Sequence, residues 1–312
     1  MKSSVALCTF NGEKFIAEQL DSILAQVQKV NEIIICDDGS TDDTISIITS
    51  YQEKFPELIQ LHKNQQQLGS VKNFEKAISL CSHELIFLCD QDDAWLPDKT
   101  KLITKYFKDN PQISVICTNG FVINEKGHLK AEKTLWDIPE SLAAKGVKFQ
   151  LESNFLIGNL ATGASMALRK DFIPLCIPFP QSPDLHHDFW LALVSIYYEK
   201  FNILSDKTIK YRSHENQQVG SIIPRKPSEE TDLYQLEDSH SSFTTLRRQI
   251  RRATLARKKL QNLDIISTET KEVLEYFNYL ATVFIDKRHS LMRRKFRISY
   301  YFWKLYYDLK YK

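Results

Sequence analysis

Short runs of apolar residues alternate with apolar residues at helical spacing along the first 120 positions of the chain. Runs typical of strands occupy residues 4–9, 32–36, 58–62, 84–90 and 114–118. Helical spacing occupies residues 13–26, 41–51, 71–80 and 97–111. Nearly continuous apolar strands are buried on both faces, and strands that alternate with helices usually pair in parallel. The pattern predicts an α/β fold with a mostly parallel central sheet flanked by helices.

The pattern changes after residue 120. Residues 124–150 are polar and irregular, which predicts a hairpin or a surface loop, whereas 187–198 have helical spacing and 203–211 a strand-like run. Beyond about residue 240 the chain has long helical patterns, no glycine, and Arg and Lys in pairs. We therefore expect an α/β domain at 1–240 and a basic, aromatic-rich helical C-terminal extension at 241–312.

Acidic residues follow two of the predicted strands directly, at 37–38 and 90–93. Ligands of such sheets bind beyond the carboxyl ends of the strands, so these residues and the segment 9–11 are expected to line one crevice. Adjacent carboxylates repel each other and favour a bound cation, and oxygen ligands suit Mg²⁺ or Mn²⁺ beside a diphosphate. The alternative is structural: acidic turns at helix starts, with Ser40 or Thr41 as the N-cap of the helix at 41–51.

Seven motifs in sequence order resemble glycosyltransferase family 2, the inverting nucleotide-sugar transferases of GT-A fold. They are CTFNGEKFIAEQLDSILAQ at 8–26, CDDGSTDDT at 36–44, GSVKNFEKAI at 69–78, LCDQDDAWLPDK at 88–99, GNLATGASMALRKD at 158–171, HHDFWLAL at 186–193 and YRSHENQQVG at 211–220. The last three are similar to rhamnosyltransferase-type members that build bacterial surface polysaccharides of capsule or O-antigen type. The resemblance covers about residues 3–222 and implies that 1–240 is a GT-A catalytic domain.

The resemblance also implies roles for individual residues by matching position. It implies sugar-nucleotide contacts for Thr9, Asn11, Glu13, Asp38, Lys72, Asn73, Asp90, Asp92, Gly163 and Ala164. It implies Asp93 as a metal ligand beside Asp92, for Mn²⁺ or Mg²⁺. It matches Asp188 with the catalytic base, which takes the proton of the acceptor hydroxyl. Without the resemblance, Asp188 is most simply a first-turn acid of the helix that follows it.

Two further candidates follow the strand at 203–211. Arg212 is a candidate for binding the diphosphate of the nucleotide sugar, because its guanidinium fork matches phosphate oxygens. His214 is a candidate metal ligand, and a surface histidine is the alternative. His186 and His187 are adjacent, which points their side chains apart and disfavours a metal site built on that pair.

Six cysteines form no CxxC pair and lie mostly in or beside apolar runs, which predicts reduced, buried thiols in a cytosolic protein. The first residues lack the apolar stretch of a secretory signal, and no window approaches the ~18 apolar residues of a membrane span. We expect a cytoplasmic protein, either soluble or peripheral on the inner face of the plasma membrane.

The net charge of +2 conceals a strong asymmetry. Residues 243–312 hold 17 Lys and Arg against six Asp and Glu, while the rest of the chain holds 24 against 33. Basic helices with interleaved aromatic rings favour an anionic membrane surface. The alternative is a helical segment packed on the catalytic domain or on a second subunit of a homodimer. No groove-reading motif accompanies the cations, so a nucleic-acid partner is not expected.

Together these patterns predict a metal-dependent inverting hexosyltransferase. Its donor would be a dTDP- or UDP-activated sugar, with rhamnose favoured, and its acceptor a saccharide or a lipid-linked saccharide. A DxD-type phosphohydrolase is the alternative enzyme. The non-enzymatic alternative is a module that binds sugar nucleotides or polyanions without catalysis.

Overall fold

The computed structural model describes residues 1–135, 161–182 and 185–215, together with residues 255 and 260. The helices and strands given below belong to one compact unit of the chain. The predicted extension at 241–312 lies outside the described residues, apart from those two positions.

The N-terminal half of the sheet is parallel, as the sequence predicts. β1 (Ser3–Thr9) pairs with both β2 (Glu32–Asp37) and β4 (Leu85–Asp90), and β3 (Ile59–Lys63) pairs with β2. The residues of β1, β2 and β4 are almost all buried, because helices cover both faces of these strands. Their carboxyl ends therefore meet at one edge, where the acidic residues at 37–38 and 90–93 lie.

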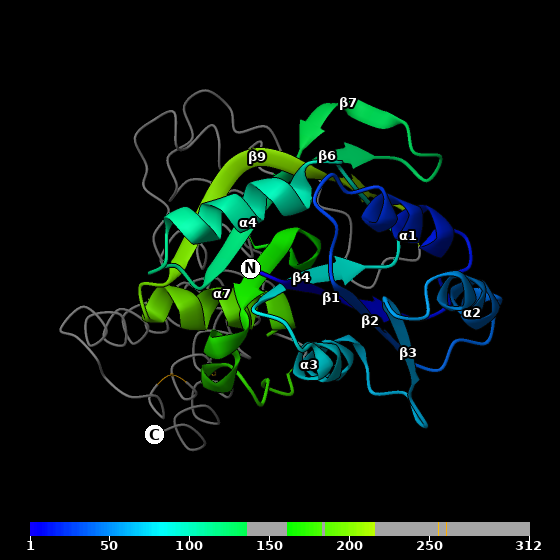
Figure 1. Cartoon of the computed structure of the whole chain (residues 1–312), viewed down its shortest axis with the longest axis horizontal. Coiled ribbons are helices and arrows are strands. Elements are labelled where there is room, and N and C mark those ends of the chain that lie inside the picture. Colours follow the sequence, from blue (N-terminus) through cyan, green and yellow to red (C-terminus); the bar gives the residue numbers. More distant parts are fainter. Residues whose placement is uncertain (136–160, 183–184, 216–254, 256–259, 261–312) are drawn as a thin grey trace, which may run out of the picture. The chain divides into compact units, whose positions relative to one another are not determined.

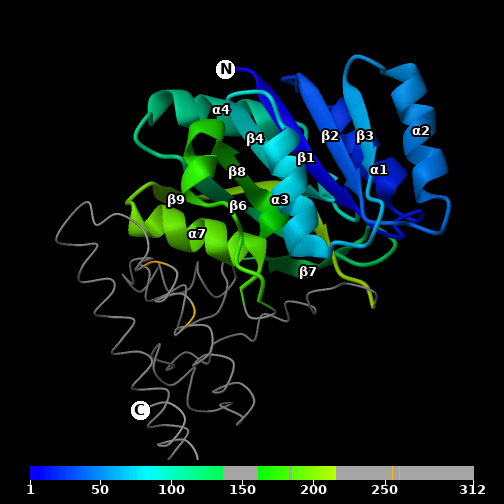
Figure 2. The same ribbon diagram turned by 90° about the horizontal axis from the view of Figure 1, so that it is seen from below.

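Five helices among the described residues connect strands of the sheet and cover its two faces (Figure 1). They are α1 (Ile16–Leu24), α2 (Thr44–Lys54), α3 (Ser70–Leu80), α4 (Lys99–Asp109) and α7 (His187–Tyr197). α3 packs on β1 and β2 and also contacts α7, so these two helices share one face. Figure 2 shows α3 and α7 in front of the strands from below. The amino-terminal ends of both helices therefore reach the same region of the molecule.

The second half of the sheet mixes strand directions. The strand order is β3-β2-β1-β4-β8-β6-β9-β5, and β7 pairs with β6 at one side. β8 (Met166–Arg169) is antiparallel to β4 and to β6 (Val115–Ile123), whereas β9 (Phe201–Arg212) is parallel to β6. The sheet is completed by β5 (Ala94–Trp95), antiparallel to β9, and by β7 (Leu129–Thr134), antiparallel to β6. Two short 3₁₀ turns, η1 (Gly163–Ser165) and η2 (Lys170–Leu175), flank β8.

The structure differs from the sequence prediction at the start of α2. The helix begins at Thr44, three residues later than expected, and neither Ser40 nor Thr41 is its N-cap. The backbone N–H of Thr41 instead donates to Asn11 Oδ1 at 2.9 Å, and the hydroxyl of Ser40 bonds the carboxylate of Asp37. The side chain of Ser40 and the backbone N–H of Thr41 are therefore engaged outside the helix, and neither residue caps it.

All six cysteines are free, and five of them are buried, as predicted for reduced thiols. In the part of the chain that the structure describes, no helix combines the length and apolar character that crossing a bilayer requires.

Candidate functional site

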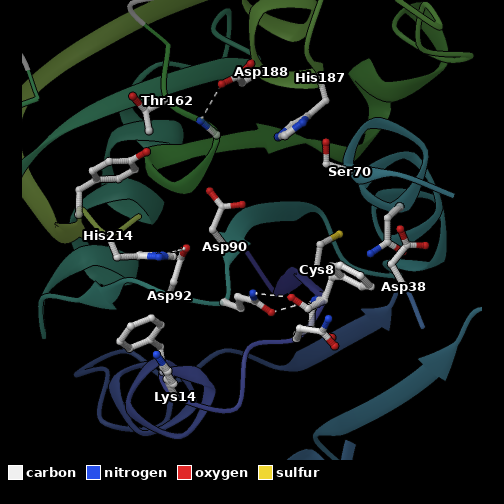
Figure 3. Close-up of a pocket in the computed structure, with 18 of the residues that line it drawn as sticks. Cys8, Lys14, Asp38, Ser70, Asp90, Asp92, Thr162, His187, Asp188 and His214 are labelled. Atoms are coloured by element: carbon white, nitrogen blue, oxygen red, sulfur yellow. Dashed lines mark hydrogen bonds and ion pairs between the residues drawn. The ribbon is translucent and has the colours of Figure 1, made fainter. Parts of the chain in front are cut away.

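A cavity of about 580 Å³ opens at the carboxyl ends of β1, β2 and β4 (Figure 3). The beginning of α7 and the end of β9 form its other walls. Its walls include most of the residues singled out from the sequence: Thr9, Asn11, Glu13, Asp38, Asn73, Asp90, Asp92, Gly163, Asp188 and His214. The expectation that the segments after the strands line one crevice is therefore met.

The loop after β1 is held by a side chain that sequence reasoning missed. Gln91 bonds both backbone groups of Phe10: the N–H of Phe10 donates to Oε1 at 2.8 Å, and Nε2 donates to the carbonyl at 2.9 Å. A Cβ at Gly12 would lie 2.2 Å from Gln91 Oε1, so only glycine fits beside this clamp. Asn11 has a φ of 48°, the left-handed conformation that asparagine tolerates better than most residues. The clamp thus fixes the position of Asn11 at the cavity wall.

Asp37 organises the turn after β2 and does not face the cavity. Its buried carboxylate accepts hydrogen bonds from Thr9 Oγ1 at 2.8 Å and from the backbone N–H groups of Ser40 and Gly39 at 2.9 and 3.1 Å. The hydroxyl of Ser40 in turn accepts from the N–H of Asn11 at 2.9 Å. Asp37 therefore joins the loops after β1 and β2 into one rigid wall.

Asp38 lines the cavity and also holds the loop between β3 and α3. Its carboxylate accepts from the N–H groups of Leu68 and Gly69 at 2.7 and 2.8 Å and from Asn64 Nδ2 at 2.8 Å. Asn64 donates as well to Oδ1 of Asn73, at 2.9 Å, so Asp38 and Asn73 share one amide. These bonds fix the position of the carboxylate at this end of the cavity. Asn64 carried no signal in the sequence.

Carboxylates and one imidazole gather at the middle of the cavity. Asp92 Oδ2 and His214 Nε2 are 2.8 Å apart, and the two side chains are only 17% and 9% exposed. Burial, followed by the charges of Asp92 and Asp188, raises the pKa of Asp90 to about 8. Within the described ranges, no three Asp, Glu, His or Cys side chains stand close enough together to form a complete metal site. A cation here would need ligand atoms from a bound substrate or from water.

Asp93, predicted as a metal ligand, is buried behind the acidic loop and does not line the cavity. Its Oδ1 accepts from the backbone N–H of Arg212 at 2.8 Å, and Oδ2 has no hydrogen-bond partner within the described residues. Burial, followed by the charges of Asp92 and Asp90, raises the pKa of Asp93 well above its usual value. The side chain thus has the surroundings of a protonated carboxyl group that supports the loop.

Arg212, predicted to bind a diphosphate, is also absent from the cavity lining and only 1% exposed. Its guanidinium donates to the carbonyls of Asp92 and Glu125 at 2.8 and 3.0 Å, and pairs with the carboxylate of Glu18. It also lies over the ring of Phe15, at 4.8 Å from the centroid. The preceding residue of β9, Tyr211, lines the cavity instead, because consecutive strand residues face opposite sides. Arg212 therefore supports the acidic loop from behind.

Asp188 lies at the start of α7, on the opposite wall from the pair of Asp92 and His214 (Figure 3). Its Oδ1 accepts from the N–H of Phe189 at 2.6 Å and its Oδ2 from the N–H of Gly163 at 3.3 Å. Both bonds come from backbone groups, which fixes the orientation of the carboxylate. Asp188 thus lines the cavity with its carboxylate held by two backbone groups.

Two other predicted residues do not line the cavity. Lys72 is exposed on α3, and Ala164 is buried in η1, where its carbonyl accepts from Lys99 Nζ at 2.8 Å. Lys99, which the sequence did not single out, is buried over the ring of Trp95, and burial lowers its pKa to about 8. Tyr211 is a cavity residue that sequence reasoning missed, and burial raises its pKa, so it presents a neutral hydroxyl.

Residues 4–175 match the sequence model described as glycosyl transferase family 2. The chain belongs to this family. An uncharacterized glycosyltransferase of Nostoc sp. is 33% identical over 118 residues, which is 37% of this chain and 36% of the relative. The dTDP-rhamnosyl transferase RfbG of Shigella flexneri is 29% identical over 231 residues, covering 70% of this chain and 75% of RfbG. The chain thus spans about a third of one relative and three quarters of the other.

Solved structures of proteins that bind nucleotide sugars share the fold. S. aureus TarS 1-349 in complex with UDP-GlcNAc superposes with a TM-score of 0.61 at 17% identity, covering 100% of this chain and 76% of TarS. The mannosyltransferase PcManGT from Pyrobaculum calidifontis, in complex with GDP-Man and Mn²⁺, gives 0.56 at 15% identity, covering 94% and 75%. The predicted GT-A fold and the predicted membership of a glycosyltransferase family are confirmed.

Proposed function

We propose that the protein is a metal-dependent, inverting hexosyltransferase. It moves a hexose from a dTDP- or UDP-activated donor to a hydroxyl of a saccharide acceptor. One observation carries this proposal: a single cavity holds Asp92 and His214 on one wall and Asp188 on the opposite wall, with Asp90 between them. Displacement of a nucleoside diphosphate needs charge stabilisation of the leaving group on one side and a base on the other.

The nucleotide of the donor is expected to occupy the end of the cavity formed by the loops after β1 and β2. Thr9, Asn11, Asp38 and Asn73 supply hydroxyl, amide and carboxylate groups there, which suit a pyrimidine and its ribose. RfbG is named as a dTDP-rhamnosyl transferase, and this supports dTDP-rhamnose as the first donor to test. TarS was crystallised with UDP-GlcNAc, which supports UDP-sugars as the second class.

The donor set in the cavity fits a divalent cation of the Mn²⁺ or Mg²⁺ type. Asp92 and His214 are in contact and Asp90 lies beside them, so two carboxylates and one imidazole supply oxygen and nitrogen donors on this side of the cavity. We propose Asp92 and His214 as the protein ligands, with Asp90 beside them, because Asp93 is turned away behind the loop. When bound, the cation would neutralise the charge of the departing diphosphate. PcManGT carries Mn²⁺ in its own structure.

Asp188 is the proposed general base. Its two backbone bonds hold the carboxylate facing the cavity, where it would accept the proton of the acceptor hydroxyl. The acceptor oxygen would then attack the sugar carbon from the face opposite the leaving diphosphate. A single displacement of this kind inverts the configuration at that carbon, by the geometric argument that applies to inverting glycosidases.

The proposed acceptor is a lipid-linked saccharide of surface polysaccharide assembly, met at the cytoplasmic face of the membrane. The support is the basic, aromatic-rich composition of residues 241–312, which almost all lie outside the described residues, and the similarity to RfbG. Basic helices of this kind are attracted to anionic lipid surfaces.

A thermal-shift screen tests the nucleotide site. The protein is heated with dTDP, UDP or GDP, each with and without Mn²⁺. We expect dTDP or UDP to raise Tm and Mn²⁺ to enlarge the rise, because a ligand that binds only the folded state stabilises it by about 2.7 kcal/mol at 100 times its Kd. A chain that shows no shift in any of the six mixtures would contradict the proposed function.

A further inference from the structure

His187 is the residue whose chemistry the proposed mechanism leaves unused. It is the first residue of α7, its side chain is only 8% exposed, and it is among the residues that line the cavity. The ring stacks on Phe74 of α3, with centroids 4.0 Å apart and planes at 22°. Its Nε2 lies 2.7 Å from the position that a Cβ of residue 163 would occupy, so Gly163 makes room for the ring. These contacts fix the plane and the position of the imidazole.

Both ring nitrogens of His187 lack a hydrogen-bond partner among the described residues. Burial lowers the pKa of the ring to about 4, so the imidazole is neutral and has one N–H donor and one acceptor nitrogen. Buried polar atoms are nearly always paired, because an unpaired one loses its bonds to water without replacement. A stacked aromatic residue such as phenylalanine would fill the same space without this cost. The unpaired imidazole therefore points to a ligand group that bonds at least one of its two nitrogens.

The neighbours of His187 indicate which part of a ligand lies there. Asp188, the proposed base, lies beside the ring in space, because the position that a Cβ of Gly163 would occupy is 2.7 Å from His187 Nε2 and 3.6 Å from Asp188 Cβ. Figure 3 labels both side chains at the same end of the cavity, so the ring lies beside the proposed meeting point of sugar and acceptor hydroxyl. Diphosphate oxygens only accept hydrogen bonds, and the proposed nucleotide end of the cavity is formed by the loops after β1 and β2. A sugar hydroxyl both donates and accepts, which matches a neutral imidazole.

We propose that His187 recognises a hydroxyl group of the transferred hexose and so contributes to the choice of donor sugar. This role rests on the proposed function, because it requires a sugar nucleotide in the cavity. It assigns His187 to substrate recognition and leaves proton transfer to Asp188.

The test compares sugar nucleotides with the corresponding nucleotides. Calorimetry in the presence of Mn²⁺ measures Kd for UDP, UDP-glucose, dTDP and dTDP-rhamnose with the wild-type chain and with His187→Phe, which keeps the stacked ring and removes both nitrogens. The matched control is His62→Phe on β3, where the Nε2 of a half-buried histidine also lacks a partner but the side chain does not line the cavity. His187→Leu, which also removes both nitrogens, replaces the phenylalanine variant if that variant does not fold, and His187→Gln, which keeps a donor and an acceptor, should retain part of the preference.

We expect the wild type to bind at least one sugar nucleotide more tightly than its nucleotide. His187→Phe should reduce that preference about 10-fold, the loss of roughly one buried hydrogen bond, and leave the Kd of the nucleotide unchanged. His62→Phe should change neither value. An unchanged preference in His187→Phe, an equal loss for nucleotide and sugar nucleotide, or a wild type without any preference would overturn the assignment. A wild type that binds none of the four compounds would instead refute the proposed function itself.

Discussion

At the scale of single residues, the cavity separates two kinds of carboxylate. Asp188 and Asp38 accept several hydrogen bonds from N–H groups, whereas Asp90 is buried near other carboxylates. Burial and like charges favour the neutral form of Asp90 and raise its pKa. The first kind is suited to accept a proton or to hold a donor group, and the second kind to meet a cation.

Replacing Asp188 by asparagine tests its role as the base. Asn keeps the size of the side chain but cannot accept the acceptor's proton, so kcat should fall by about 10²–10⁴. The affinity for the nucleotide, measured by calorimetry with UDP or dTDP, should stay the same, because Asp188 lies on the opposite wall from Asp92 and His214. Unchanged turnover would remove Asp188 from the mechanism.

The raised pKa of Asp90 predicts how stability depends on pH in protein freed of metal by EDTA. In the folded state this carboxyl stays protonated up to a pKa of about 8, while in the unfolded chain it ionises at about 3.9. The unfolded chain therefore binds fewer protons between these values, and the free energy of unfolding falls as pH rises. Lys99, whose pKa burial lowers to about 8, also titrates near the upper end of the window from pH 6.5 to 8, but it is present in the wild type and in Asp90→Asn alike, so the difference between the two proteins isolates the effect of Asp90.

Asp90→Asn should remove roughly 1–2 kcal/mol of this decline across the window, since one proton per molecule no longer titrates. Urea unfolding of both proteins at pH 6.5 and at pH 8 measures it. Part of the slope should persist in the variant, because the pKa of Asp93 is raised as well. Equal slopes in the two proteins would show that Asp90 is not the titrating group.

At the scale of elements, the acidic loop after β4 is held in place by the end of β9. Arg212 bonds the loop through the backbone carbonyl of Asp92 and through the side chain of Asp93, and His214 follows two residues later at the cavity. The same guanidinium reaches Glu18 of α1 and the carbonyl of Glu125 beyond β6. One buried side chain therefore sets the relative positions of four segments around the proposed cation site.

Arg212→Met should be strongly destabilising, by about 2–4 kcal/mol in urea unfolding, because a buried guanidinium is lost and the carbonyls of Asp92 and Glu125 and the carboxylate of Glu18 lose their donor at once. It should also abolish the Mn²⁺-dependent part of the thermal shift, since Asp92 and His214 lose their support. Lys14→Met is the control: Lys14 forms an exposed pair with Glu125 at 3.5 Å, and such pairs contribute at most ~1 kcal/mol. Similar stability losses in the two variants would contradict a supporting role for Arg212.

At the scale of the whole molecule, the charge of the chain is divided between an acidic part that contains the cavity and a basic segment after residue 242. The acidic part attracts cations to the site, and the basic segment is the part we propose to meet anionic lipids. If that is correct, catalysis occurs close to the surface on which a lipid-linked acceptor is held.

Vesicle sedimentation tests the membrane proposal. We expect the full chain to sediment with vesicles of phosphatidylglycerol and phosphatidylcholine but not with phosphatidylcholine alone. A full-length variant in which Arg247, Arg248, Arg251 and Arg252 are glutamine should lose roughly 4 kcal/mol of this attraction, since each cation contributes about 1 kcal/mol. The membrane proposal would be refuted if the wild type and the variant stayed in the supernatant to the same extent with both kinds of vesicle.

The sequence by itself determined the family, the order of most elements and the gathering of acidic residues at one edge. It could do so because parallel strands are nearly continuous apolar runs and because their carboxyl ends meet at the same edge of a sheet. The short strands β5 and β8 escaped prediction, since two to four residues show no periodicity and depend on their partners.

Only the tertiary structure decided which way individual side chains face. The sequence predicted Asp93 as a metal ligand and Arg212 as a ligand of the diphosphate, but both lie behind the acidic loop, where each binds the other's segment. The roles of three further residues also depend on the tertiary structure. Gln91 and Asn64 bond residues that are distant in the chain, and His187 has two ring nitrogens without a partner among the described residues. Periodicity reports burial, whereas the direction of a side chain in a turn is set by these long-range contacts.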